Sequence, residues 1–183
     1  MANKVKLKTL VEKMNLKNLT PDVDLSEKEV EIPDINRPAL QLTGFFEHFD
    51  SERVQIIGYV EYTFLEKMTD EVKKKKIYET LLSYKIPCLI FCRNLPPEAM
   101  LLEMAEKANI PVFQTEKKTS EFTAEIIRWL NLRLRAFPSL SRVIKQTVEV
   151  HIIHKRNFAC ALGDRACRNG RKVLYFTMNM RVS

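Results

Sequence analysis

The sequence predicts an α/β fold over residues 1–134, a mostly parallel sheet flanked by helices, followed by an irregular basic tail over 135–183. Short apolar segments alternate with amphipathic segments of about 12–15 residues, an order that produces right-handed βαβ units. One segment, Pro87–Phe91, is apolar throughout, which is typical of a strand buried on both faces. The composition, 45% hydrophobic and 29% charged, is that of a globular protein.

The first 60 residues predict one helix and two strands. Apolar residues recur at helical spacing near the N-terminus, namely Leu7, Leu10, Val11 and Met14. A turn follows at 18–24, and Val30–Ile32, just before a proline, predicts a short or edge strand. The β-branched segment Val54–Ile57 ends at Gly58 and predicts a second strand.

The rest of this region alternates helices with strands. One apolar face predicts a helix over 70–82, for which Thr69 is a candidate N-cap. Pro96 suits the start of the next helix, Ile110–Gln114 predicts a strand, and a last helix begins near Ser120. Its apolar face comprises Phe122, Ile126, Ile127, Trp129, Leu130 and Leu134.

The net charge of +7 is confined to one end of the chain. Residues 1–134 carry 20 basic and 21 acidic residues, whereas 135–183 carry 10 and 2, and arginine rises from 5 of 20 basic residues to 7 of 10. This shift predicts a domain boundary near residue 134. Within the first part, Lys73–Lys76 point around most of a helix, so we interpret them as a solvated face rather than a phosphate-binding patch.

Several classes of protein are excluded or disfavoured. No apolar run approaches the roughly 20 residues of a membrane-spanning helix, and the N-terminus lacks the apolar stretch of a secretory signal. On one strand, Cys88 and Cys92 would lie about 13 Å apart, too far for a disulfide. These features predict a cytoplasmic protein. The chain has four glycines, which disfavours a glycine-rich phosphate loop.

The segment 35–65 is the most unusual because polar residues interrupt its apolar pattern. Gly44 and Gly58 are half of all the glycines, so each is expected at a backbone position that a Cβ would disturb. Gln55 lies within an apolar strand and needs a hydrogen-bond partner if it is buried. His48 has no histidine or cysteine near it in sequence, so we do not assign it as a ligand or base.

This segment resembles the N-terminal domain of bacterial HPr kinase/phosphorylase. The family pattern is I-x-R-P-x-L-x-L-x-G-x-F-x-x-[FY], followed by R-x-Q-x-x-G-x-x-E-x-x-[FY]-L. The matching positions whose side chains or backbone are candidates for a functional role are Arg37, Pro38, Gly44, Arg53, Gln55, Gly58 and Glu61. The resemblance extends over about 5–134, with further matches in the predicted helices and strands.

The resemblance implies a fold like that of Mur ligase N-terminal domains, self-association into oligomers, and a part in bacterial carbon catabolite repression and phosphotransferase system regulation. Members of the family phosphorylate and dephosphorylate a serine of the phosphocarrier HPr, with ATP and Mg²⁺. Catalysis resides in a second, C-terminal domain with a G-x-x-x-x-G-K-[ST] loop. The present sequence has no such loop; its nearest approach, 163–172, has six residues between the glycines and valine in place of the hydroxyl.

We therefore assign no catalytic, cofactor-binding or metal-binding residue to this chain. The expected function is that of a non-catalytic regulatory or assembly domain of a truncated HPr kinase/phosphorylase. The chain would be an enzyme only if a catalytic domain were supplied from elsewhere.

Three interpretations of the tail 135–183 remain open. The first is a frameshift after about Leu134, because the composition changes where the resemblance ends. The second is a zinc site, with His151, His154, Cys160 and Cys167 as candidate ligands, although the close cysteine pair typical of structural sites is missing. The third, the alternative function, is a nucleic-acid-binding module that uses the basic charge.

Deleting 135–183 should leave the thermal midpoint of the remaining domain nearly unchanged. The tail shows no sustained amphipathic period to offset the roughly 1–2 kcal/mol per residue that ordering a backbone costs. Differential scanning calorimetry of the whole chain and of 1–134 makes the comparison. A large fall in the midpoint would make the tail an evolved part of the fold and contradict the frameshift.

Overall fold

A computed structural model of the chain describes residues 3–134, within which one five-stranded sheet, one two-stranded sheet, five α-helices and a short 3-10 helix form. The five strands, in sheet order, are β2 (Lys17–Asn18), β7 (Val112–Gln114), β6 (Leu89–Phe91), β5 (Val54–Ile57) and β4 (Ile35–Asn36). Neighbours from β4 to β7 pair in parallel, and β2 is an antiparallel edge. The predicted α/β fold with a mostly parallel sheet is confirmed, and the strands predicted at Val54–Ile57, Pro87–Phe91 and Ile110–Gln114 all belong to this one sheet.

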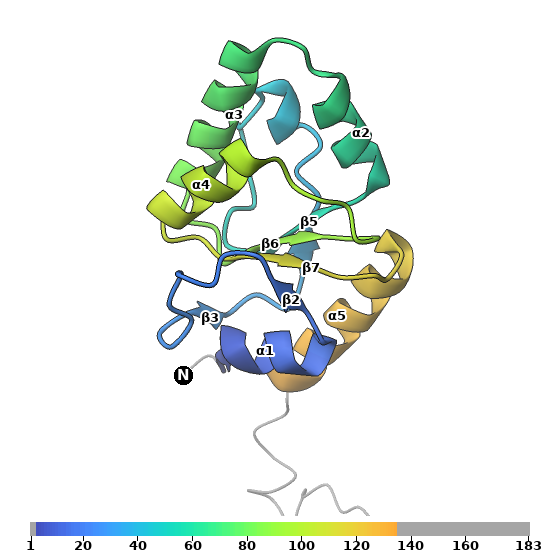
Figure 1. Cartoon of the computed structure of the whole chain (residues 1–183). Helices are drawn as coiled ribbons and strands as arrows, with labels where there is room; N and C mark the ends of the chain where they lie inside the picture. The colour runs from blue at the N-terminus through green and yellow to red at the C-terminus, as the bar shows by residue number, and fades with distance from the viewer. Residues whose placement is uncertain (1–2, 135–183) are drawn as a thin grey trace, which may run out of the picture. The chain divides into compact units, whose positions relative to one another are not determined.

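Helices cover both faces of this sheet (Figure 1). The helices α2 (Tyr59–Lys67), α3 (Glu71–Ser83) and α4 (Ala99–Lys107) lie on one face, and α1 (Leu7–Met14) and α5 (Thr119–Leu134) lie on the other. Strands β1 (Val5–Lys6) and β3 (Glu29–Val30) form the antiparallel two-stranded sheet. The domain therefore has three layers.

Two hydrophobic cores lie on opposite sides of the sheet because successive strand residues point to opposite faces. Ile56 and Ile90 pack with α1 and α5, whereas Ile57 and Phe91 pack with α2, α3 and α4. All four are at most 1% exposed. Burial on both faces explains why β5 and β6 lack the apolar–polar alternation of a half-exposed strand.

The expectations for helix α3 need two corrections. Its N-cap is Asp70, whose Oδ1 accepts the Lys73 backbone N–H at 3.0 Å, so Thr69 as the cap is wrong. The solvated-face interpretation fails for Lys74, which is 4% exposed and forms an ion pair with Glu98 at 2.9 Å. Lys74 lies one turn before Ile77 and Tyr78, on the apolar face of the helix.

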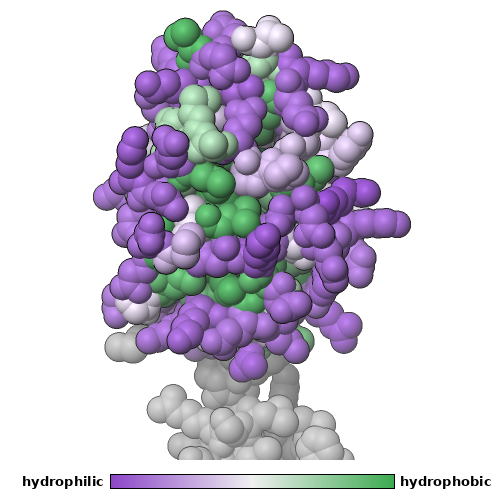
Figure 2. Space-filling model, viewed as in Figure 1, coloured by the Kyte–Doolittle hydropathy of each residue, from purple (hydrophilic) through white to green (hydrophobic). Residues whose placement is uncertain are grey.

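Hydrophilic side chains cover most of the face seen in Figure 2, with small separate hydrophobic areas between them. Large hydrophobic side chains that are exposed in the described residues include Val60 and Phe64 on α2, and Leu40 and Phe45 beside the 3-10 helix η1 (Gln41–Thr43). Val60 and Phe64 are four residues apart and share one helix face.

The basic tail and every interpretation of it, including the four candidate zinc ligands and the nucleic-acid module, lie outside the described residues. Within residues 3–134, no helix is both long and apolar enough to cross a bilayer.

Candidate functional site

The candidate site lies beyond the carboxyl ends of the parallel strands. From this edge, α2 follows β5 toward one face of the sheet and α5 follows β7 toward the other (Figure 1). Open α/β sheets bind ligands at this edge. A pocket of about 590 Å³ is found here. We call it the carboxyl-edge pocket, and the lining residues that matter for its chemistry are Arg37, Tyr59, Arg93, Thr119, Ser120 and Thr123.

One wall of the carboxyl-edge pocket is organised by a buried glutamate. Glu61 Oε2 accepts the backbone N–H of Gly58 at 3.0 Å, which caps the start of α2. The same oxygen accepts a hydrogen bond from Arg37 Nη2 at 2.8 Å. The Glu61 side chain is 3% exposed and that of Arg37 is 43% exposed, so the ion pair joins the buried base of the site to its solvent side.

Gly58 lets the starts of α2 and α5 approach closely. A Cβ added at Gly58 would lie 2.7 Å from Thr119 Oγ1 and 2.9 Å from its Cγ2. Contacts this short do not occur between real side chains, so the glycine is required by space rather than by backbone conformation. The expectation that a Cβ would disturb this position is confirmed.

Arg93 enters the site on a loop with an unusual backbone. Both Arg93 and Asn94 are in the left-handed region, with φ of 61° and 52°, which non-glycine residues adopt at some cost. The Arg93 N–H donates to the Lys117 carbonyl at 3.0 Å and the Asn94 N–H to the Thr115 carbonyl at 2.9 Å. These two hydrogen bonds fix the loop after β6 against the loop before α5.

Cys88 and Cys92, which lie directly before and after β6, are buried and free. Burial raises the pKa of the Cys92 thiol to about 11, although a hydrogen bond with the Thr119 side chain and the charge of Arg37 act in the opposite direction. Burial also raises the pKa of Cys88. Both thiols are therefore protonated at neutral pH, and neither is an activated nucleophile.

Two other family-motif residues, Gln55 and Arg53, do not line the pocket and instead connect β5 and the loop before it to β4. Gln55 is fully buried; its Nε2 donates to the carbonyls of Asp50 and Arg53, and its Oε1 accepts from Asn36 Nδ2 at 2.8 Å. The partners that its burial required are thus present. The Arg53 guanidinium pairs with Asp34 at 3.2 Å and Asp50 at 3.4 Å. These contacts tie the loop before β5 to β4.

Pro38 and Gly44 shape the turn after β4. The Pro38 carbonyl accepts the N–H of Leu42 at 3.0 Å at the start of η1. Gly44 ends η1 with φ of 101°, a conformation that disfavours any side chain, although an added Cβ would meet no described atom within 4 Å. Glycine is therefore favoured at position 44 by the backbone conformation, whereas at position 58 it is required by the lack of space for a Cβ.

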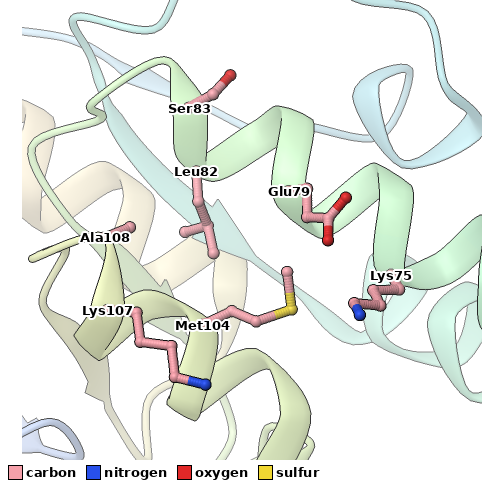
Figure 3. A pocket seen from close by; sticks show the side chains of 7 residues that line it. All are labelled: Lys75, Glu79, Leu82, Ser83, Met104, Lys107 and Ala108. Carbon is pink, nitrogen blue, oxygen red and sulfur yellow. The ribbon is translucent and has the colours of Figure 1, made fainter.

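A second depression, of about 480 Å³, lies between α3 and α4. Figure 3 shows Lys75 and Glu79 from α3 and Lys107 from α4 around it, with Leu82 and Met104 between the two helices. It lies away from the strand ends, and charges of both signs border it. We therefore favour the carboxyl-edge pocket as the functional site.

Of the seven family-motif residues, the structure brings Arg37, Gly58 and Glu61 together at this pocket. Arg93, Thr119 and Ser120 were not predicted, and their signal in the sequence is weak because they come from segments that are distant in sequence from the family motif. Arg93 does lie two residues beyond the end of a buried strand, in a region where side chains reach the carboxyl edge of a sheet. Among residues 3–134, no group of three or more histidine, cysteine, aspartate or glutamate side chains is arranged to hold a metal.

The fold and site define an α/β domain with a polar pocket at the carboxyl edge of its sheet. The family described as HPr Serine kinase N terminus matches residues 5–130. The chain therefore belongs to the HPr kinase family and contains its N-terminal domain.

Relatives with curated descriptions agree with this assignment. The chain is similar to HPr kinase/phosphorylase of Lachnoclostridium phytofermentans, 49% identical over 140 residues that cover 76% of this chain and 45% of the relative. It is also similar to HPr kinase/phosphorylase of Clostridium tetani, 35% identical over 149 residues, with 81% and 48% covered. The chain thus spans about half the length of these relatives.

A more distant likeness is to a solved structure, the CBS and DRTGG domains of the regulatory region of Clostridium perfringens pyrophosphatase. It is 17% identical, has a TM-score of 0.47, and covers 67% of this chain and 46% of that chain. No functional conclusion follows from a likeness at this level.

Proposed function

We propose that residues 5–134 form a non-catalytic regulatory or assembly domain of an HPr kinase/phosphorylase. The observation that carries the proposal is the extent of the family match, which covers 5–130 with the N terminus of the family while the curated relatives are about twice as long. The sequence has no G-x-x-x-x-G-K-[ST] loop to cradle nucleotide phosphates, which supports a non-catalytic role.

The proposed partners are HPr, through the complete enzyme, and other copies of the domain. The full-length enzyme would use ATP and Mg²⁺ in the cytoplasm, in carbon catabolite control. Exposed apolar side chains on α2 support the assembly role, since Val60 is 67% exposed and Phe64 42% exposed on one helix face. Large apolar side chains exposed together on one helix face are a feature of many protein contacts.

The purified 183-residue chain should neither phosphorylate HPr at the expense of ATP nor remove phosphate from phosphoserine-HPr. Its sequence has no G-x-x-x-x-G-K-[ST] loop to bind the β- and γ-phosphates, and we assign no general base among residues 3–134, whereas phosphoryl transfer depends on both. Mass spectrometry of HPr after incubation with the chain, ATP and Mg²⁺ measures the first reaction. Release of phosphate from phosphoserine-HPr measures the second.

The full-length relative from Lachnoclostridium phytofermentans provides the positive control. Turnover above the blank that requires Mg²⁺ would contradict the non-catalytic role. The assembly role is examined separately by light scattering of the same preparation, where a strictly monomeric chain at all concentrations would argue against it.

A further inference from the structure

The carboxyl-edge pocket combines positive charge from two separate loops. Arg37 comes from the loop after β4 and Arg93 from the loop after β6. The charge of Arg37 is balanced by Glu61, which lies on its buried side. Arg93 has no ion-pair partner within residues 3–134, so a net positive charge remains beside the pocket.

The N-termini of α2 and α5 also lie at the pocket, and they differ in whether a carboxylate already caps them. The first turn of α2 is already capped by the Glu61 carboxylate. The α5 helix has 16 residues, and the N–H groups of its first turn have no intrahelical partners. The positive end of its dipole therefore adds to the charge of Arg93. One acidic residue, Glu121, lies in this turn and does not line the pocket.

The hydroxyl groups of Ser120 and Thr123 supply further donors, whereas that of Thr119 is already hydrogen-bonded with Cys92. Thr119 and Ser120 line the pocket together with Thr123. The Thr123 Oγ1 is inaccessible to solvent and has no hydrogen-bond partner in the described part of the chain. Buried hydroxyls are rarely left unpaired. Because the residue itself is partly exposed, rotation about its Cα–Cβ bond would turn the hydroxyl toward the pocket and give it an acceptor in a ligand.

This set of donors matches a group with several oxygen acceptors and negative charge. A guanidinium donates two parallel hydrogen bonds to phosphate oxygens, and helix N-termini with hydroxyl side chains complete such sites. The pocket volume of about 590 Å³ exceeds that of a phosphate group alone, and the Tyr59 side chain, 57% exposed, lies at its edge. An organic part of a ligand could pack on this ring.

We propose that the carboxyl-edge pocket binds a phosphate group, either free or at the end of a small organic molecule. Arg93, the first turn of α5 and the Thr123 hydroxyl provide the contacts, while Glu61 holds Arg37 in place beside them. The proposal concerns binding alone and does not depend on the proposed regulatory role.

The test is a titration of the ¹⁵N-labelled 183-residue chain with inorganic phosphate at constant ionic strength, followed residue by residue in ¹H–¹⁵N spectra. Site resolution is needed because the basic tail also attracts anions. Saturable shifts at the amides of Arg93, Thr119 and Ser120 are expected. The absence of shifts at these amides up to about 10 mM phosphate, near the weak limit of specific binding, would overturn the proposal.

Variants separate specific binding from general attraction. Arg93→Gln should weaken binding at the α5 amides by about tenfold or more, since it removes charge-assisted hydrogen bonds. Lys107→Gln removes an equal charge from the α3–α4 groove and should change affinity by less than about twofold, because salt screens exposed charges at that range. Equal weakening by both variants would overturn the proposal.

Two further measurements complete the design. Thr123→Val keeps the shape of the side chain and should weaken binding by about threefold, as loss of one neutral hydrogen bond does. Phenyl phosphate is compared with inorganic phosphate in the native chain and in Tyr59→Ala. Tighter binding of phenyl phosphate that is lost in Tyr59→Ala assigns the pocket to a phosphorylated organic molecule, and equal affinity assigns it to free phosphate.

Discussion

Gly58→Ala should destabilise the domain by roughly 1–3 kcal/mol, the usual cost of forcing an extra group into a packed site. The new Cβ would lie 2.7 Å from Thr119 Oγ1, at the start of a helix that cannot move without disturbing its core face. For a domain of this size we expect the thermal midpoint to fall by roughly 3–5 °C for each kcal/mol. Chemical denaturation of the native and variant chains measures the difference.

The origin of this loss is tested by relieving the contact. Thr119→Ala removes the two nearest atoms that the new Cβ would meet and leaves only Glu61 Oε2 at 3.0 Å, so the double variant Gly58→Ala/Thr119→Ala should recover much of the loss. Gly44→Ala is the matched control. Its cost of about 1–2 kcal/mol comes from a left-handed backbone, so Thr119→Ala should not relieve it. Strictly additive effects of the Gly58 and Thr119 substitutions would contradict the steric explanation.

Glu98→Ala should cost roughly 1–3 kcal/mol, because it leaves a buried ammonium group without its main partner. The Lys74 side chain is 5% exposed, and its Nζ lies 2.9 Å from Glu98 Oε1. Tyr78 also donates its hydroxyl hydrogen to Glu98, at 3.3 Å. Glu71 remains as a partner of Lys74 at 3.5 Å, which keeps the expected cost below that of a fully isolated buried charge.

Removing the lysine instead should have a much smaller effect. In Lys74→Met the apolar stem is kept, and Glu98, 37% exposed, can be hydrated, so the change should be within about 1 kcal/mol. Equilibrium unfolding in urea compares the two variants with the native chain. Equal losses for Glu98→Ala and Lys74→Met would show that the pair itself, rather than the stranded charge, determines the energy.

The stabilisation that the Lys74–Glu98 pair contributes to the fold depends on pH. Burial alone would lower the pKa of Lys74, but the hydrogen bond and charge of Glu98 outweigh it and raise the pKa above its ordinary value of 10.5. A group whose folded-state pKa is raised stabilises the fold fully below the unfolded value. The contribution of Lys74 is thus complete at neutral pH and declines only as the pH rises above 10.5.

Strands β3, β5, β6 and β7 and every helix except α2 could be predicted from the sequence because their patterns are local, whereas the two-residue strands β1, β2 and β4 were missed, and the turn predicted at 18–24 overlaps β2. Val54–Ile57 was predicted with its observed bounds, since a β-branched run ends there at a glycine. Helix α2 was missed because it buries a charged residue and exposes several apolar ones, the reverse of the usual amphipathic pattern. Glu61 is buried together with Leu65, whereas Tyr59, Val60 and Phe64 are exposed, so most of the large apolar residues do not mark the inner face.

The error at Lys74 has a different cause. The sequence places this lysine at helical spacing from Ile77, Tyr78 and Leu81, so its position on the inner face was readable. Its burial depends on Glu98, which lies in the loop before α4 and meets it only through folding.

The carboxyl-edge pocket could be predicted only in part. Arg37, which lines it, shares one motif with Gly58 and Glu61, which lie behind it, but the proximity of Gly58 to Thr119 and of Arg93 to Lys117 is tertiary. No spacing within a single sequence reports that two loops meet. The parallel sheet order, once known, identifies the edge where those loops gather.

The pairing of β2 with β7 constrains the order in which a newly synthesised chain can fold. Lys17 pairs with Gln114, and α1 shares its core with α5, so the earliest segments to leave the ribosome have partners that are made last. Strands β4, β5 and β6 can pair with neighbours close in sequence while synthesis continues. The apolar face of α1 must wait, exposed to chaperones and to other nascent chains, until nearly the whole domain has emerged.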